Sequence, residues 1–364
     1  MNLSCTKENL LAGLNTVSRI ASKNLTLPIL GNVLVRAEGG TISLSATNLE
    51  VGVVATVRGK IIEAGSITIQ ARLLLDYIGL LDSDKVELVS DGASLKVSSA
   101  NSETVIRGNA ADDFPIIPSV AREHGIKVSG PTLRGALAQV LFAAAQDTSR
   151  PEISGVHLTV EKKSLVLAAT DSYRLAERTI EISGGSDRNM IIPTRPLVEL
   201  TRILPADGEV EMFFSDSQVL VAADGIELTT RLIEGQYPDY QQIVPTSSST
   251  TATIEIESLT KLVKTASLFC KPGINDVTIA IDPDAKSINC AAANTELGEH
   301  HGNMKAAITG PACTIVFNYK YLLDGLSNIG TTNVTLGVTD SGSPGVLRPS
   351  PAADYFYLIM PIRQ

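Results

Sequence analysis

Tryptophan is absent from this chain of 364 residues, and aromatic residues make up only 4% of it. The shortage disfavours a ligand pocket lined by aromatic rings, whereas the abundant valine, isoleucine, leucine, alanine and threonine favour aliphatic sheets. A hydrophobic share of 44% supplies enough apolar surface for buried cores and therefore excludes a wholly disordered chain. A chain of this length is expected to form roughly two to three domains.

Cysteine is also scarce, and the four that occur are scattered without a CxxC pair. We predict that Cys5, Cys270, Cys290 and Cys313 are reduced, buried thiols of a cytosolic protein and not a disulfide framework. The amino-terminal segment lacks a basic stretch followed by an apolar core, so we expect no signal peptide. The longest apolar run, at 355–362, is too short to span a bilayer. These absences predict a soluble, cytoplasmic protein with no membrane partner.

Catalytic motifs are missing as well: the chain has no GxxxxGKS/T loop, no GxGxxG and no GxSxG elbow. Ser172 has no histidine nearby in the sequence to activate it. His300 and His301 adjoin Glu299 and could bind a metal, although a polar surface turn is the simpler interpretation. We therefore predict a binding or structural protein without enzymatic activity, cofactor or metal. A hydrolase that uses Ser172 or the histidine pair is a weaker alternative.

The chain does contain an internal repeat, because separate motifs recur at one ungapped offset of 123 residues. Unrelated motifs that share one offset indicate a duplicated domain, and a weaker third copy keeps the same order. The sequence thus predicts three similar domains at 1–120, 121–247 and 248–364. The repeated motifs are Leu10, Leu14 and Val17 with Leu133, Leu137 and Val140; Ala46-Thr47-Asn48 with Ala169-Thr170-Asp171; Phe114-Pro115 with Tyr237-Pro238; and, in the third copy, Leu259, Leu262 and Val263.

Each copy alternates between two hydrophobic periods. An apolar stripe at i, i+4 and i+7 follows a short strand and predicts a helix, and segments such as 156–160 then alternate with period two, as strands do. A second helix is expected at 72–81, 195–204 and 320–329, followed by further strands. This order predicts an α+β fold in which every domain has two β-α-β-β-β halves that pack helices on antiparallel sheet.

Charge is unevenly distributed along the chain, whose formal net charge is −9. With the first helices taken as 7–23, 131–145 and 258–271, the six expected helices carry +7 and everything else carries −16. A solvated helix face would explain such a bias in one helix. A bias shared across the repeats favours a positive surface that faces a polyanion. Arg72, Arg195 and Lys320 also repeat a cation at the same helix start.

Five segments carry a more specific signal when they are read in order on the threefold repeat. They are LTLPILGN at 25–32, ATDSYRL at 169–175, YPDY at 237–240, Phe317-Asn318 with Tyr321-Leu322, and LIMPIR at 358–363. Together they resemble the bacterial β sliding clamps, the processivity subunits of DNA polymerase III, and the resemblance covers the whole chain.

The resemblance implies a ring-shaped, head-to-tail homodimer with helices lining the bore and antiparallel sheet outside. Such a ring would encircle double-stranded DNA without sequence preference. It would tether the replicative DNA polymerase, the clamp loader and repair proteins through their short linear peptide motifs, and so confer processivity. The alternative from another class is a three-module, β-rich protein-interaction scaffold that does not bind DNA.

Three sets of site residues are implied by the resemblance. The DNA-facing bore set is Lys23, Arg72, Arg134, Arg195, Arg202, Lys261, Lys264 and Lys320. The partner-peptide pocket set is Ile153, Thr170, Tyr173, Arg174, Leu175, Pro238, Ile243, Asn318, Tyr321, Leu358, Ile359, Met360, Pro361 and Ile362. The dimer-interface set is Thr104, Ile106, Leu268 and Phe269. Plain solvation is the alternative for each cation, and simple core packing is the alternative for Leu175, Leu358 and Ile359.

Overall fold

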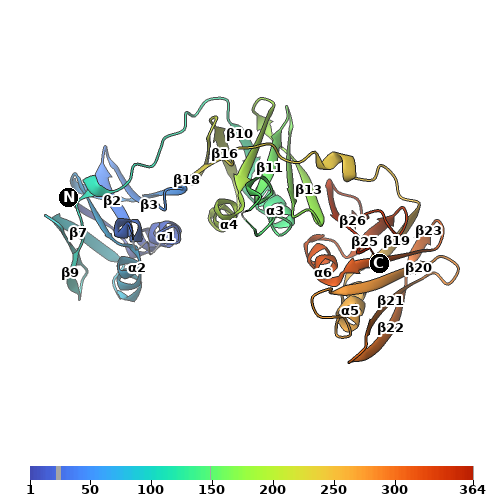
Figure 1. Cartoon of the computed structure of the whole chain (residues 1–364). Coiled ribbons are helices and arrows are strands. Elements are labelled where there is room, and N and C mark those ends of the chain that lie inside the picture. Colours follow the sequence, from blue (N-terminus) through green and yellow to red (C-terminus); the bar gives the residue numbers. More distant parts are fainter. Residues whose placement is uncertain (22–25, 148, 364) are drawn as a thin grey trace. The chain divides into compact units, whose positions relative to one another are not determined.

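A computed structural model describes residues 1–21, 26–147 and 149–363 of the chain (Figure 1). In these ranges the chain forms six α-helices and a larger number of strands, and all strand pairs are antiparallel. The first repeat consists of β1 (Asn2–Thr6), α1 (Lys7–Val17), β2 (Asn32–Glu38), β3 (Thr41–Thr47), β4 (Val51–Val57), β5 (Gly59–Glu63), β6 (Gly65–Gln70), α2 (Ala71–Leu80), β7 (Lys85–Asp91), β8 (Ser94–Ser98) and β9 (Glu103–Arg107).

The second and third repeats have the same order of elements. The second consists of β10 (Ile126–Ser129), α3 (Gly130–Leu141), β11 (Gly155–Val160), β12 (Ser164–Thr170), β13 (Arg174–Glu181), β14 (Ser183–Gly184), β15 (Arg188–Pro193), α4 (Thr194–Ile203), β16 (Glu209–Phe214), β17 (Gln218–Ala223) and β18 (Ile226–Arg231). The third consists of β19 (Thr250–Glu255), α5 (Ile256–Ser267), β20 (Asp276–Asp282), β21 (Ser287–Asn294), β22 (Gly298–Lys305), β23 (Ala307–Thr309), β24 (Cys313–Asn318), α6 (Tyr319–Asn328), β25 (Asn333–Val338), β26 (Gly345–Ser350) and β27 (Tyr355–Ile359).

This order confirms the predicted α+β fold of three similar domains, each with two β-α-β-β-β halves. The first half of each repeat adds one short strand, which is β5, β14 or β23. None of the helices in the described ranges is long and apolar enough to cross a membrane.

The described chain divides into two compact units. The first comprises Met1–Pro131, Ser183–Gly185 and Arg195–Leu232; the second comprises Thr132–Ile182, Ser186–Thr194 and Ile233–Gln364. The first unit holds a nine-stranded sheet in the order β14-β10-β16-β17-β18-β4-β3-β2-β6 and a five-stranded sheet, β5-β1-β7-β8-β9. The second unit holds a nine-stranded sheet in the order β15-β11-β12-β13-β27-β26-β25-β19-β23 and a four-stranded sheet, β22-β21-β20-β24.

Both nine-stranded sheets join two repeats in the same way. The last strand of one repeat pairs with the fourth strand of the repeat before it: β18 with β4 in the first unit, and β27 with β13 in the second. A sheet edge exposes unpaired backbone N–H and C=O groups, and this pairing satisfies them. The second repeat therefore carries both strands needed for the connection: a fourth strand that accepts the next repeat and a last strand that pairs with the repeat before it.

Helix α1 illustrates how the sequence builds each repeat. The Thr6 hydroxyl accepts a hydrogen bond from the Asn9 N–H (3.2 Å) and so caps the first turn. The stripe of Leu10, Leu14 and Val17 is fully buried where α1 packs on β3 and β4. The i, i+4, i+7 pattern thus identifies both the helix and its core face.

The first helices end earlier than the sequence pattern predicts. Helix α1 ends at Val17, where the Ser18 N–H donates to the Leu14 carbonyl (2.9 Å) and the chain turns away. Helix α5 ends at Ser267, so Lys271 lies outside it, as Arg19 lies outside α1. The six helices contain eight lysines and arginines and five acidic residues, an excess of three. The predicted helix charge of +7 is therefore wrong; the value is +3.

The four cysteines are free thiols, as predicted. Cys5, Cys270 and Cys290 are buried, but Cys313 is only half-buried, which corrects the expectation for that residue. Burial raises the thiol pKa of Cys5 and Cys270 to about 11 and that of Cys290 to about 12, because the interior disfavours the thiolate. These thiols consequently behave as small apolar core groups at neutral pH.

Helix α6 packs closely against the β27 strand at one glycine. A Cβ atom on Gly325 would lie 2.3 Å from two ring carbons of Tyr357, which is fully buried. The ring cannot move away easily, because its hydroxyl donates a hydrogen bond to the Tyr321 carbonyl (3.0 Å) and the surrounding core is dense.

The substitution Gly325→Ala should lower the free energy of unfolding of the second unit by about 1–3 kcal/mol, because the added methyl group overpacks the contact with Tyr357. Gly135→Ala in α3 is the matched control, since a Cβ there meets no atom within 4 Å. It should raise the free energy of unfolding by about 0.5–1 kcal/mol. Urea denaturation followed by circular dichroism measures both. Equal stability of the two variants would contradict the packing argument.

Candidate functional site

The motif ATDSYRL forms a tight turn between β12 and β13. The Thr170 hydroxyl donates to the Arg174 carbonyl (2.6 Å) and accepts from the Ser172 N–H (3.1 Å). Asp171 Oδ1 accepts from the N–H groups of Tyr173 and Arg174, both at 3.0 Å. Ser172 has a φ of +78°, a left-handed conformation that the side-chain hydrogen bonds around it stabilise. The turn leaves the Tyr173 side chain 62% exposed.

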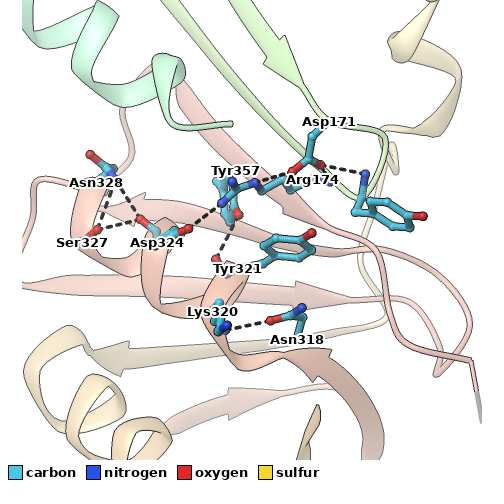
Figure 2. A network of polar contacts seen from close by, with 10 residues as sticks. Asp171, Arg174, Asn318, Lys320, Tyr321, Asp324, Ser327, Asn328 and Tyr357 are labelled. Carbon is cyan, nitrogen blue, oxygen red and sulfur yellow. Dashed lines mark hydrogen bonds and ion pairs between the residues drawn. The ribbon is translucent and has the colours of Figure 1, made fainter. Parts of the chain in front are cut away.

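Arg174 is the centre of a polar network that connects β13 with α6 (Figure 2). Its Nε donates to Asp171 Oδ2 (2.8 Å) and its Nη1 to Asp324 Oδ2 (2.6 Å), although the side chain is only 11% exposed. The guanidinium also lies over the Tyr321 ring, 4.6 Å from its centroid, and 5.6 Å from the centroid of Phe142. One cation thus holds two carboxylates and two rings together.

The electrostatics of the network follow from this arrangement. Burial opposes the charge on Arg174, but the neighbouring Tyr357, Asp324 and Asp171 outweigh it and raise the pKa of the guanidinium. Burial also raises the pKa of the Tyr357 phenol and, with the Asp171 carboxylate, that of Tyr321. Arg174 therefore stays charged while both phenols stay neutral at physiological pH.

An apolar cluster lies beside the network. Ile153, Leu175 and Leu358 are buried in it together with Tyr237 and Tyr240, and Met360 packs against it while partly exposed. Four of the predicted pocket residues are thus core residues, because Ile153, Leu175, Leu358 and Ile359 are at most 3% exposed. For Leu175, Leu358 and Ile359 this is the core alternative that the sequence left open.

Six other pocket residues are at or near the surface of the second unit, whereas Thr170 is buried in its turn. Tyr173 and Ile243 are exposed, and Pro238, Met360, Pro361 and Ile362 are partly exposed. Two backbone hydrogen bonds hold the carboxyl-terminal segment: the Met360 N–H donates to the Tyr173 carbonyl (2.9 Å) and the Ile362 N–H to the Val316 carbonyl (2.8 Å). Asn318 caps α6 by accepting from the Lys320 N–H (2.9 Å).

The seven predicted bore cations that the structure describes all lie on helices. Arg72, Arg195, Arg202, Lys261, Lys264 and Lys320 are exposed, and Arg134 is half-buried on α3. Two of them are paired along their own helix: Arg72 with Asp76 (2.9 Å) and Arg202 with Glu199 (2.6 Å). Such exposed pairs are weak and leave the cations accessible. Lys23 lies outside the described residues.

The predicted interface residues lie in different surroundings. Thr104 and Ile106 are on β9, an edge strand of the first unit, but Ile106 is buried in its own sheet. Leu268 is exposed at the end of α5, and the Phe269 ring stacks on His300 with centroids 5.8 Å apart.

The residues of the hydrolase alternative have other surroundings than a catalytic site requires. Ser172 accepts a hydrogen bond from Arg150 Nη1 (3.0 Å), which is not a base. His301 and Glu299 lie on β22, with His301 Nε2 3.8 Å from Glu299 Oε2, and both side chains are exposed. Within the described residues, no group of three or more histidine, cysteine, aspartate or glutamate side chains could hold a metal ion.

Family models give the class of protein. The three domains of the DNA polymerase III beta subunit match in order: the N-terminal domain over residues 1–118, the central domain over 127–239 and the C-terminal domain over 241–363.

Individual relatives agree over the full length. The chain is 31% identical to the beta sliding clamp of Synechocystis and 28% identical to that of Staphylococcus epidermidis, covering 100% of this chain and 99% of each relative. It also superposes on the sliding clamp of Bacillus subtilis with a TM-score of 0.95 and 26% sequence identity. On the sliding clamp of Pseudomonas aeruginosa bound to griselimycin, the TM-score is 0.95 and the sequence identity is 27%. These superpositions cover all of this chain and at least 99% of the others. The chain belongs to the DNA polymerase III beta subunit family, the beta sliding clamps.

Family membership confirms the prediction of a non-enzymatic DNA sliding clamp and removes the support for the DNA-independent scaffold. It also confirms that the partners of this family are DNA and the polymerase.

Sequence reasoning missed two members of the Arg174 network. Asp324 comes from α6, 150 positions further along the chain, and Phe142 follows α3. The only local signal was the i, i+3 spacing from Tyr321 to Asp324 on a predicted helix, which places both side chains on one face.

The substitution Arg174→Lys should lower the free energy of unfolding of the second unit by about 1–3 kcal/mol. An ammonium group cannot bond both carboxylates in this planar geometry while it covers the Tyr321 ring. Arg36→Lys is the control, because Arg36 is exposed on β2. Thermal unfolding measured by calorimetry checks both variants. If Arg174→Lys unfolds at the wild-type temperature, the network does not stabilise the junction between β13 and α6.

Proposed function

We propose that this sliding clamp acts as a cytoplasmic, head-to-tail homodimeric ring that encircles double-stranded DNA and docks partner peptides on the second unit. The observation that carries the proposal is the full-length likeness to sliding clamps in three domains that match in order. Such a protein works by topology: a closed ring cannot dissociate from DNA without opening, so it needs only weak contacts that permit sliding.

The strand order supports closure of the ring by a second copy. Within the chain, β18 pairs with β4 and β27 pairs with β13, whereas the equivalent strands β9 and β22 are edges of the five-stranded and four-stranded sheets. Pairing β9 of one copy with β22 of the other would form a third nine-stranded sheet by the same rule. Two such contacts close a head-to-tail dimer and remove both exposed edges.

The predicted interface residues fit this pairing with one change of role. Exposed Leu268 and the neighbouring Phe269 supply apolar surface at the end of α5. Ile106 is buried, so β9 would contribute mainly its backbone and the half-exposed Thr104. Backbone pairing with an apolar patch beside it is a common way to join two chains.

The helical cations are the proposed DNA contacts. The helix excess of three positive charges is small, and it is set in a chain of net charge −9. A modest positive potential attracts phosphate without gripping it, and phosphate contacts carry no sequence information. Arg72, Arg195 and Lys320, at the starts of the second helices, are the leading members of the bore set.

The peptide site is proposed to include the exposed Tyr173 and Ile243 and the partly exposed Met360, Pro361 and Ile362. Tyr173 adjoins the carboxyl-terminal segment, because its carbonyl accepts the Met360 N–H. These side chains offer apolar contacts to an extended peptide, and Met360 can adapt to different ligands. Arg174, the neighbour of Tyr173 in the turn, is held by Asp171 and Asp324, so the turn that carries Tyr173 is fixed in position. A preorganised site lowers the entropy cost of binding.

Loading onto DNA tests the ring directly. After incubation with its clamp loader, ATP and a nicked circular duplex, the protein should remain on the circle and leave once the circle is cut to a linear molecule. On the circle it should withstand about 0.5 M salt, which strips proteins that rely on phosphate contacts. Gel filtration of labelled DNA measures retention, and a sample without loader is the control. Equal retention on circular and linear DNA would disprove encirclement.

Tyr173→Ala tests the peptide site. Loss of this exposed ring should weaken stimulation of the cognate polymerase by about tenfold or more, as expected for an aromatic anchor at a peptide interface. Ile62→Ala, which removes an exposed side chain from β5, should leave stimulation unchanged. Processive synthesis on a primed single-stranded circle is the readout, with sedimentation to verify the dimer. Wild-type stimulation by Tyr173→Ala would place the docking surface elsewhere.

A further inference from the structure

The tight turn of the candidate site has a counterpart 123 residues earlier, in the first unit. The Thr47 hydroxyl donates to the Val51 carbonyl (2.9 Å) and accepts from the Leu49 N–H (3.0 Å). Asn48 Oδ1 accepts from the N–H groups of Glu50 (3.0 Å) and Val51 (2.8 Å). Leu49 has a φ of +76°, close to the value for Ser172. The two turns therefore share the same set of side-chain-to-backbone hydrogen bonds and a left-handed residue at the same position.

The strand beside each turn is also equivalent. In the first unit Thr230 pairs with Val51, and the Arg231 N–H donates to the Glu50 carbonyl (3.3 Å). In the second unit Ile359 pairs with Arg174, and the Met360 N–H donates to the Tyr173 carbonyl. We call each turn, together with the strand end that pairs with it, a backbone frame: 47–51 with 230–231 in the first unit, and 170–174 with 359–360 in the second. The backbone frame of the proposed peptide site is thus present twice in the chain.

A cavity of about 210 Å³ lies at the frame in the first unit. Its rim includes two exposed apolar side chains, Leu49 (49% exposed) and Ile116 (92% exposed). Ile117 covers Gly52, where a Cβ would lie only 2.6 Å from a methyl group of that isoleucine. Pockets for whole small molecules measure roughly 300–1,000 Å³. This cavity therefore suits one side chain of a longer ligand.

The charged groups of this cavity differ from those of the second unit. Arg231 stands where the second unit has Met360, and Val51 stands where it has Arg174. Arg231 is exposed and forms no ion pair with any residue that the structure describes. Thr229 and Gln218 add polar groups to the lining, as does the carboxylate of Glu50. An unpaired guanidinium beside an apolar opening complements a carboxylate next to an aliphatic side chain.

We propose that this cavity is a second docking site, which takes a short extended peptide segment of a partner protein. An aliphatic side chain of the peptide enters between Leu49 and Ile116, and an adjacent carboxylate pairs with Arg231. The inference rests on the peptide-binding role proposed for the equivalent frame in the second unit. It differs from that role in ligand chemistry, because the first site selects an acidic peptide.

Methyl NMR of the full chain, labelled at isoleucine, tests the proposal. The probes are acetyl-Gly-Leu-Asp-Gly amide and its charge-reversed partner, acetyl-Gly-Leu-Lys-Gly amide. The aspartate peptide should shift the Ile116 and Ile117 methyl signals in a saturable way and bind roughly two- to fivefold more tightly than the lysine peptide. In Arg231→Gln the two peptides should bind equally, because the charge that distinguishes them is gone.

Two further variants complete the experiment. Ile116→Ser should weaken binding, read at the Ile117 methyl group, whereas Ile62→Ser, a matched change on β5, should leave it unchanged. The Ile243 and Ile362 signals report on the second unit in the same spectra. Shifts there without shifts at Ile116 and Ile117 would overturn this proposal and leave the proposed function standing. Shifts at Ile116 and Ile117 alone would support a first-unit site with its own ligand chemistry, and the loading and Tyr173→Ala experiments test the proposed function separately. Equal affinity of the two peptides for the wild-type chain would also overturn it.

Discussion

Backbone hydrogen bonding at sheet edges is the constraint from which the rest of this structure follows. Each half-domain ends in a strand with an open row of N–H and C=O groups, and such an edge must be paired or shielded. β4 and β13 are closed by β18 and β27, the last strands of the following repeats. The register is continuous over five residue pairs in each case, from Ile226 with Ala55 to Thr230 with Val51, and from Arg174 with Ile359 to Arg178 with Tyr355. A slip of one residue would turn the buried side chains outward.

The candidate site is a consequence of that pairing. β27 brings its end beside the turn at 170–174, so the carboxyl-terminal segment, the turn and α6 meet at Arg174. The attraction within a partly buried ion pair adds little net stability, since desolvation offsets it, although removing one partner still costs stability. Its effect here is directional: two carboxylates and the Tyr321 ring allow the guanidinium one position, and the turn and α6 are oriented by it. The apolar surface around Tyr173 and Met360 is therefore presented on a fixed frame.

The sequence predicted the repeat, the helices and the character of most strands, because these depend on local periodicity. It did not predict that β18 joins β4, since alternation shows which side chains face the core but not which strand lies alongside. The ends of α1 and α5 were overestimated because apolar spacing continues past the last helical turn; Ile20 is buried although it follows the helix. Asp324 was missed because nothing local relates it to Arg174. Leu358 and Ile359 are buried, as the core alternative allowed, because every residue of β27 is buried where it lies in the nine-stranded sheet.

Duplication explains why one backbone frame carries two different surfaces. The turn of Thr47 and Asn48 and the turn of Thr170 and Asp171 are both required for the strands that pair at each junction, whatever the side chains beyond them do. Positions outside that requirement are free to differ. Gly52 in the first unit holds the position that Leu175 holds in the second, and Arg231 holds the position of Met360. A glycine admits Ile117 close to the sheet and leaves a small cavity, whereas leucine fills the corresponding space as core. The need to pair backbone groups at the sheet edges thus keeps the backbone frame the same in both units. The side chains that take no part in this pairing can differ, and they decide which ligand chemistry each frame can recognise.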